Sequence, residues 1–415
     1  MRLSVFVRPC WLLFALACIG GALLAIAYFS AKTPPRVLDD PTVVWMFEQA
    51  ERGAIISTPV VTEDCIYVAA IRDSAFDPSG VVYCLDRERG ELRWKFDDDG
   101  AMKHTYSTPC LANGRLYIGE GMHGNDVCKM YCLDAATGHK AWDFVTGGHI
   151  ESSPCVADGA VFFGSGDDGL FCLDAVSGAK RWQFHGRWHV DVRPVIANGR
   201  VYAGSGISRL VPKAEIFCLD ASNGQPLWRT PTELPVWGSP VLDGDQVFFG
   251  TGTGRLTMSA EPPEKPAGAL VCADANVGKI QWIYPVADAI FSSPGVDAER
   301  VYFGARDGRC YCLDRRSGRK LWQQELGSPI VTRPALVEGR LYIAASGGQV
   351  DCLDMEDGRP LWTFNLAKHT QTRPQLLSSP VVLDTGEKDR PCLIYLGTEL
   401  RRGEESAAVL YCLRR

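Results

Sequence analysis

Three histidines in the first half of the chain occur at one fixed distance from a proline. Each stands five residues before that proline, and a polar side chain follows two residues later: His104 with Tyr106, His149 with Glu151, and His189 with Asp191. Residues two apart on a strand point to the same face. Imidazole, phenol and carboxylate groups that share a face can exchange protons, hold a polar ligand or coordinate a metal ion.

The sequence lacks three common motifs, one catalytic, one zinc-binding and one phosphate-binding. There is no G-x-S-x-G nucleophile motif, no H-E-x-x-H zinc motif and no phosphate-binding glycine loop. The acidic run at Asp97 to Gly100 lacks the spacing and the terminal glutamate of an EF-hand, so we expect a solvated loop. The 415 residues carry a net charge of -6 without a basic block, which argues against nucleic-acid binding.

The elements that position these side chains are set by a repeat. The spacing Cys-x-Asp-x3-Gly-x3-Trp occurs seven times, with the glycine expected to supply a positive φ and the aspartate to accept backbone N–H groups of the same turn. The tryptophan offers an apolar face and an N–H that needs a carbonyl partner when buried. The seven copies are Asp86, Gly90 and Trp94; Asp134, Gly138 and Trp142; Asp174, Gly178 and Trp182; Asp220, Gly224 and Trp228; Asp274, Gly278 and Trp282; Asp314, Gly318 and Trp322; and Asp354, Gly358 and Trp362.

A proline element precedes each copy, and an eighth proline unit runs to the end of the chain without reaching a tryptophan. Each unit reads as four short strands separated by turns, which predicts one antiparallel four-stranded sheet. Trp45 stands alone before the first unit, so we expect its segment to supply the missing outer strand of the last sheet. The prediction is an all-β, eight-bladed β-propeller over residues 42–415, closed as a ring by its N-terminal strand.

In such a ring, the connections that join blades and those between the second and third strands emerge on one face. His104, His123, His149, His185, His189 and His369 all fall in these connections, whereas His139 falls in a turn of the other face. Arg193 and Arg333 stand directly before blade prolines, and Trp188 and Trp237 offer flat surfaces nearby.

Three interpretations of this channel mouth remain open: a solvated polar rim, a ligand or peptide site, and a metal site. Ligands from different blades are expected to lie too far apart for bonds of about 2.0–2.2 Å, so no metal site is predicted. The working hypothesis is a ligand- or partner-binding site whose residues are His104, Tyr106, His149, Glu151, His189, Asp191, Arg193, Trp237 and Arg333.

The chain has 16 cysteines, and eight of them hold the first position of the repeat or its equivalent in the last unit. The repeat units themselves hold these equivalent positions apart. We therefore expect small buried thiols rather than a disulfide framework.

The repeat resembles the tryptophan-docking motif of the pyrroloquinoline-quinone (PQQ) propellers, with Cys where that family usually has Ala. The family contains PQQ- and calcium-dependent alcohol and sugar dehydrogenases, and non-catalytic propellers of the BamB type. This chain lacks the adjacent cysteine pair of many alcohol dehydrogenases, and its blade loops are short. The resemblance implies a binding or assembly scaffold for cell-envelope proteins, with no cofactor; the alternative is a PQQ-dependent dehydrogenase that holds PQQ and calcium.

The N-terminus differs from the repeats. An uncharged run from Cys10 to Phe29 is long enough to span a bilayer, and Arg2 and Arg8 precede it. We expect residues 1–31 to be a retained membrane anchor, residues 32–41 a linker, and the propeller to lie on the extracytoplasmic, periplasmic side. Cleavage near Ala27 or Ala31, and lipidation at Cys18, are the alternatives.

Overall fold

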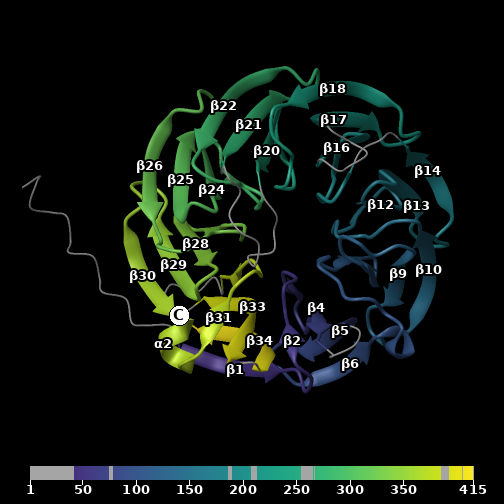
Figure 1. The fold of residues 1–415 in the computed structure, drawn as a ribbon, viewed down its shortest axis with the longest axis vertical. Coiled ribbons are helices and arrows are strands. Elements are labelled where there is room, and N and C mark those ends of the chain that lie inside the picture. The colour runs from purple at the N-terminus through teal and green to yellow at the C-terminus, as the bar shows by residue number, and fades with distance from the viewer. Residues whose placement is uncertain are drawn as a thin grey trace, which may run out of the picture. The chain divides into compact units, whose positions relative to one another are not determined.

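The described residues form eight antiparallel sheets arranged around a central axis (Figure 1). The computed structural model describes residues 42–73, 78–185, 189–206, 213–253, 265, 267–384, 392–403 and 405–414. Neighbouring innermost strands contact one another around the axis, for example β7 (Cys110–Ala112) with β11 (Cys155–Ala157), and β11 with β15 (Val195–Ala197). The predicted eight-bladed all-β propeller is confirmed.

Each blade runs from an inner strand to an outer strand in chain order. The first four blades are blade 1, with β2 (Gly53–Ala54), β3 (Val60–Val61), β4 (Cys65–Arg72), β5 (Ser79–Asp86) and β6 (Leu92–Phe96); blade 2, with β7, β8 (Arg115–Gly119), β9 (Cys128–Asp134) and β10 (Lys140–Thr146); blade 3, with β11, β12 (Ala160–Gly164), β13 (Leu170–Asp174) and β14 (Lys180–Phe184); and blade 4, with β15, β16 (Arg200–Gly204), β17 (Ala214–Asp220) and β18 (Pro226–Thr232).

The other four blades repeat this plan, and the last also takes a strand from the start of the domain. They are blade 5, with β19 (Val241–Asp243), β20 (Gln246–Gly252), β21 (Gly268–Asp274) and β22 (Ile280–Val286); blade 6, with β23 (Gly295–Val296), β24 (Arg300–Gly304), β25 (Arg309–Asp314) and β26 (Lys320–Glu325); blade 7, with β27 (Ala335–Val337), β28 (Arg340–Ala345), β29 (Gln349–Asp354) and β30 (Pro360–Asn365); and blade 8, with β31 (Arg373–Gln375), β32 (Val381–Leu383), β33 (Leu393–Arg402), β34 (Glu405–Arg414) and β1 (Thr42–Glu48).

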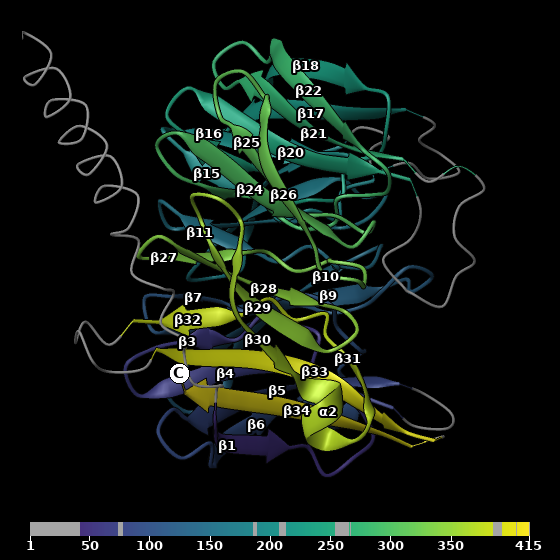
Figure 2. The same cartoon turned by 90° about the vertical axis from the view of Figure 1, so that its left-hand side faces the viewer.

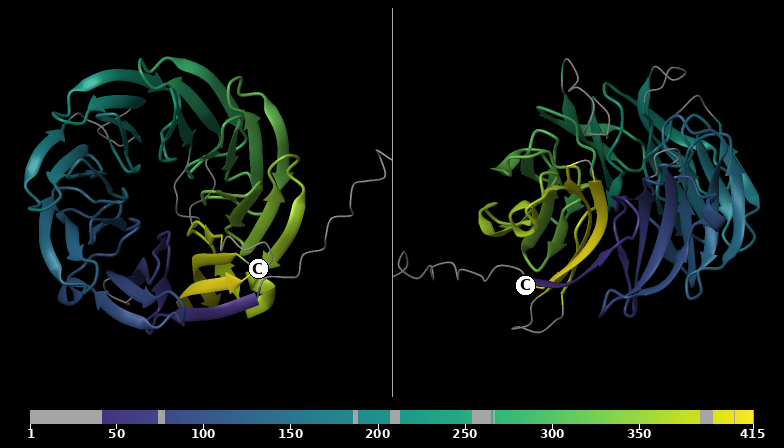
Figure 3. Two further views of the ribbon diagram at one scale, coloured as in Figure 1. Left: turned by 180° about the vertical axis from the view of Figure 1, so that it is seen from behind. Right: turned by 60° about the horizontal axis from the view of Figure 1, so that its bottom comes forward.

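The ring closes through β1, which pairs antiparallel with β34 and places Trp45 opposite Cys412. The same pairing joins Trp142 to Cys132 inside blade 2, so β1 occupies the outer-strand position that the chain end leaves open. Figures 2 and 3 show β1 beside the long strands β33 and β34. The predicted closure by the segment around Trp45 is confirmed: β1 covers the edge of β34 and becomes the outer strand of blade 8.

The repeat motif joins neighbouring blades as well as shaping its own turn. The indole Nε1 of Trp142 donates a hydrogen bond to the carbonyl of Ala175 in blade 3, at 3.3 Å. Gly178 of the same turn lies under the indole, where an added Cβ would stand 2.7 Å from the ring. Trp228 repeats both contacts against blade 5, with Ala275 O at 3.0 Å and Gly278 beneath its ring. The glycine is therefore required for close approach in addition to its positive φ.

The aspartate and the glycine of the motif shape the turn as predicted from the sequence. The carboxylate of Asp134 accepts hydrogen bonds from the backbone N–H groups of Ala136 and Thr137, at 3.1 and 2.9 Å. Gly138 has a φ of +76° in the same turn. The aspartate and the glycine thus hold a turn whose carbonyl and flat surface receive the tryptophan of the preceding blade.

The core lies between the second and third strands of adjacent blades, which are buried along most of their length. In blade 3, Phe162 and Leu173 are buried, whereas the outer strand β14 is exposed at its first two residues and only partly buried at the next two. The eight repeat cysteines are buried thiols that form no disulfide, and burial raises the pKa of Cys172 to about 12. The expectation of small buried thiols at the repeat position is confirmed.

No helix among the described residues is long and apolar enough to cross a membrane. The two described helices are the short 3₁₀ turn η1 (Asp98–Gly100) and α2 (Leu366–Thr370). The apolar run from Cys10 to Phe29 lies outside the described residues, so the anchor and linker remain predictions.

Alanine substitutions at two glycines can distinguish two contributions to stability: the strain of a positive φ, and the close contact with a tryptophan ring. Gly278 and Gly339 have φ values of +72° and +73°, but an added Cβ meets Trp228 at 2.4 Å in the first case and nothing within 4 Å in the second. Gly339→Ala should lower the free energy of unfolding by about 1 kcal/mol. Gly278→Ala should cost about 1–3 kcal/mol more, because the indole must move. Denaturant unfolding of both variants measures the difference; equal losses would contradict the docking role.

Candidate functional site

Four side chains from three connections converge on the face that carries the blade-to-blade connections, called here the loop face. His123 lies between β8 and β9, His149 between β10 and β11, and His189 and Asp191 between β14 and β15. One ligand atom from each of the four lies within 4.8 Å of the others. Of the described residues, this is the one group of three or more histidine, cysteine or acidic side chains with that geometry. We call these four residues the His–Asp cluster.

Glycines and backbone bonds hold the connections in place. Gly166 has a φ of +46°, and a Cβ at that position would stand 2.7 Å from Cε1 of His149, so the imidazole lies directly against the glycine backbone. The connection from β14 to β15 is anchored on both sides, because Val190 N donates to Gly166 O at 3.0 Å and Gly206 N donates to His189 O at 2.7 Å. These contacts give the cluster a rigid backbone frame.

Two carboxylates orient the imidazoles from outside the cluster. Glu151 Oε1 lies 2.7 Å from Nδ1 of His123 and also accepts its backbone N–H at 2.7 Å. Asp167 Oδ1 lies 2.8 Å from Nδ1 of His189. Because each Nδ1 is engaged by a carboxylate, each Nε2 points inward, and the two Nε2 atoms lie 2.9 Å apart.

Asp191 and His149 complete the cluster at short distances. Asp191 Oδ2 lies 2.7 Å from His189 Nε2 and 3.6 Å from His123 Nε2, and Asp191 Oδ1 lies 3.3 Å from His149 Nε2. These are ion-pair distances, yet neither Asp191 oxygen nor His149 Nε2 has a partner in hydrogen-bond geometry among the described residues. All three atoms are buried.

The cluster is sheltered on every side except at His123, whose side chain is 47% exposed against 9%, 6% and 10% for His149, His189 and Asp191. Burial lowers the pKa of His189, but Asp191 and Asp167 outweigh it and raise that pKa to about 9. The hydrogen bond with Glu151 raises the pKa of His123. Burial raises the pKa of Asp191, but His149 and His189 hold it well below its usual range. The site therefore attracts positive charge.

The structure separates the other predicted residues from this cluster. His104 is buried with its Nδ1 3.3 Å from Pro78 O, and its ring meets Tyr106 edge to face at 6.4 Å. Trp237 donates its indole N–H to Gly252 O at 3.1 Å and packs edge to face on Phe291. Trp188 lies outside the described residues.

Arg193 and Arg333 form a second feature of the loop face. Both side chains are exposed, although burial by surrounding protein lowers the pKa of Arg333 and the charge of Arg193 lowers it further. The positive charge of Arg193 therefore acts unfavourably on that of Arg333. Of the nine predicted site residues, the structure unites His149, Glu151, His189 and Asp191, and it brings in His123 and Asp167, which the sequence prediction did not select.

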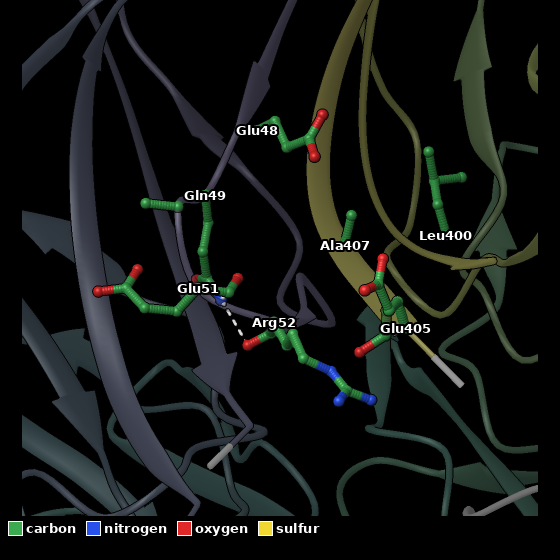
Figure 4. Close-up of a pocket in the computed structure, with 9 residues that line it drawn as sticks. Glu48, Gln49, Glu51, Arg52, Leu400, Glu405 and Ala407 are labelled. Atoms are coloured by element: carbon green, nitrogen blue, oxygen red, sulfur yellow. Dashed lines mark hydrogen bonds between the residues drawn. The ribbon is translucent and has the colours of Figure 1, made fainter. Parts of the chain in front are cut away.

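A separate pocket of about 240 Å³ lies at the seam between blades 8 and 1 (Figure 4). Gln49 holds the backbone there by donating from its Nε2 to the carbonyls of Glu51 and Arg52, at 2.9 and 3.1 Å. The pocket does not coincide with the predicted site. Its lining residues are Glu48, Gln49, Ala50, Glu51, Arg52, Leu400, Glu405, Ser406 and Ala407.

A family model described as outer membrane protein assembly factor BamB matches residues 78–211, 185–261 and 266–390. These segments make up well over half of the chain. The chain belongs to this family. The resemblance to PQQ-like propellers drawn from the repeat is thereby confirmed, because known structures of both functional classes share the fold.

BamB from Moraxella catarrhalis matches this BamB-family chain with a TM-score of 0.62 at 16% identity, over 90% of this chain and 98% of that chain. Quinohemoprotein alcohol dehydrogenase from Comamonas testosteroni matches with a TM-score of 0.66 at 14% identity, over 92% of this chain and 78% of that chain. At these identities the likeness shows the fold alone.

Quinohemoprotein alcohol dehydrogenase ADH-IIG of Pseudomonas putida is 26% identical over 138 residues, which are 30% of this chain and 18% of that protein. The match therefore spans less than a fifth of that relative's length.

In the acidic run at Asp97 to Gly100, Asp99 and Gly100 are exposed as expected, but Asp97 and Asp98 are ion-paired, which corrects the expectation of a wholly solvated loop. Asp98 lies in η1 and contacts Lys129 Nζ at 2.8 Å and Lys140 Nζ at 2.7 Å, and its side chain is 12% exposed. Asp97 pairs with Arg72 at 2.8 Å. The chain's own cations therefore neutralise these two carboxylates.

This ion pairing makes stability depend on pH. Burial raises the pKa of Asp98, but the two lysines outweigh it and lower that pKa to about 2, below the usual value of about 3.9. A lowered pKa contributes stability that is present above about pH 4 and is lost as the pH falls through about 2. Asp98→Asn should lower the free energy of unfolding at pH 7 by about 2 kcal/mol, and the difference from wild type should close near pH 2. Asp99→Asn, at the exposed neighbour, is the control; a pH-independent difference for Asp98→Asn would contradict the ion pair.

Proposed function

We propose that this chain is a membrane-tethered, extracytoplasmic scaffold that binds a protein or peptide of the cell envelope through its loop face, in the manner of a BamB-type propeller. The family match supports this reading. The correspondence with BamB extends over 98% of that chain, whereas 78% of the Comamonas dehydrogenase is covered. The anchor and the periplasmic side are parts of the proposal that rest on the run from Cys10 to Phe29.

The observation that carries the proposal is the pair Arg193 and Arg333. In other blades a hydroxyl residue stands directly before the proline and ties the blade to its neighbour: Thr58 N donates to Thr108 Oγ1 at 3.1 Å, and Thr108 N donates to Ser153 Oγ at 2.9 Å. The backbone N–H groups of Arg193 and Arg333 still donate this bond, to Ser239 Oγ at 3.0 Å and Ser379 Oγ at 2.9 Å. A guanidinium group has no acceptor atom, however, so neither arginine side chain can accept the corresponding bond from the preceding blade. At these two positions the chain replaces an accepting hydroxyl with an exposed cation, which is typical of a binding site.

Two cations that repel each other in the absence of a partner are suited to an acidic one. A carboxylate-bearing segment would remove the repulsion and form charge-assisted hydrogen bonds with both guanidinium groups. We therefore infer that the partner offers an acidic peptide or an acidic loop to this face.

Charge reversal tests the proposal. Arg193→Glu combined with Arg333→Glu should reduce cross-linking of envelope proteins to the loop face in intact cells by about tenfold, with an unchanged melting temperature, because both side chains are exposed. The matched control reverses Arg316 and Arg319, which are exposed on the opposite face in the turn between β25 and β26. Equal cross-linking by wild type and the loop-face variant would contradict the proposal.

The alternative is a PQQ-dependent dehydrogenase, favoured by the 26% identity to ADH-IIG over 138 residues. The residues present do not fit its calcium ion. The one potential ligand group among the described residues offers three nitrogen atoms and one carboxylate, whereas calcium takes six to eight oxygen ligands.

Reconstitution separates the two functions. The full chain, purified in detergent and incubated with PQQ and Ca²⁺, should reduce an acceptor dye with alcohols or sugars no faster than the buffer does. Dye reduction that requires PQQ, the chain and the substrate together would support the dehydrogenase and overturn the scaffold.

A further inference from the structure

We propose that the His–Asp cluster of His123, His149, His189 and Asp191 binds a divalent first-row transition-metal ion of the zinc type. This site does not depend on the scaffold proposal, because it uses none of the residues that carry that proposal.

The first argument is the inward direction of two imidazole nitrogens. Glu151 and Asp167 engage the Nδ1 atoms of His123 and His189, which leaves the two Nε2 atoms facing each other at 2.9 Å. A carboxylate behind a histidine is the usual arrangement at metal centres, where it fixes the ring and raises its basicity. Two such histidines therefore point to one shared position.

The second argument is the lack of hydrogen-bonded partners at the same position. A proton on one of the two facing Nε2 atoms can form a hydrogen bond between His123 and His189. In contrast, His149 Nε2 and both carboxylate oxygens of Asp191 are buried and make no hydrogen bond among the described residues. The side chains of His149 and Asp191 are 9% and 10% exposed, so water does not readily replace a partner. The contacts between these groups are at ion-pair distances, but a buried polar group that makes no hydrogen bond is costly, and a cation bound among the four ligand atoms would satisfy all of them.

The distances suit coordination after small side-chain rotations. Tetrahedral ligands at about 2.1 Å from an ion lie about 3.4 Å from one another. The separations between pairs in the cluster include 2.7, 3.3 and 3.6 Å, and the most distant atoms are within 4.8 Å. The expectation that ligands from different blades lie too far apart is therefore wrong for these four residues, because the three connections bring their ligand atoms within 4.8 Å of one another.

The donor set selects the class of ion. Three imidazoles and one carboxylate favour zinc, copper, nickel or iron over calcium and magnesium, which prefer oxygen ligands. The exposed edge of His123 gives an entry path on an otherwise closed site. A bound ion would tie together three connections that are otherwise joined by backbone and side-chain hydrogen bonds.

Cobalt and zinc binding tests the site on the full chain, purified in detergent with a tag that contains no histidine and stripped with a chelator. Wild type should bind one equivalent of Co²⁺ with the visible absorption of four-coordinate cobalt, and Zn²⁺ should displace it. His149→Ala should weaken Zn²⁺ binding at least 100-fold in competition with a chromogenic chelator. Glu151→Gln and Asp167→Asn should weaken it about 10- to 100-fold, because they orient ligands.

The control is His104→Ala, since His104 occupies the same register before its proline but lies outside the cluster. It should retain wild-type affinity. If His149→Ala does not fold, His123→Ala, at the exposed edge, serves as the second ligand variant. Zn²⁺ affinity of the wild type no higher than that of both ligand variants would overturn the site. The variant with Arg193→Glu and Arg333→Glu should still bind the metal, so failure of the scaffold proposal is distinguishable from failure of the metal site.

Discussion

The docking of a tryptophan onto the next blade, made by Trp45 and by six of the seven repeat tryptophans, is the interaction on which the ring depends. Trp142, for example, reaches Ala175 O and lies against Gly178, so the outer strand of one blade is joined to the turn of the next. The contact combines an apolar ring face with one directional hydrogen bond, and therefore sets both the spacing and the orientation of neighbouring sheets. Trp45 in β1 donates the same hydrogen bond to Arg87 O at 3.2 Å, so blade 8 docks onto blade 1 in the same way as blades 1 to 6 dock onto their neighbours.

The fold was predictable because every blade repeats one pattern. The missing tryptophan of the eighth unit and the unpartnered Trp45 indicated the closure, and the pairing of Trp45 with Cys412 confirms it. The docking of a tryptophan onto the glycine turn of the next blade could not be predicted from the repeat spacing. Gly178 and Trp142 belong to different copies of the motif, and sequence spacing within one copy cannot show which tryptophan covers which glycine.

The candidate site was predictable in part for the same reason. A common register placed His149 and His189 on one face, and the structure confirms that they lie together. His123 lies between β8 and β9, and Asp167 lies between β12 and β13. Neither residue shares the register before a blade proline, so spacing gave no reason to join them to the cluster. His104 shares the register but lies apart, because the paths of individual loops depend on contacts that a repeat does not encode.

Closure by β1 also has a consequence for biosynthesis. The first strand of the propeller pairs with its last strand, so blade 8 can be completed only after β34 has been synthesised. Until then β1 stays unpaired, and the apolar faces of blade 1 that pack against blade 8 stay uncovered. Such end-to-end pairing slows the final step of folding and lengthens the time in which a chaperone can act on the chain.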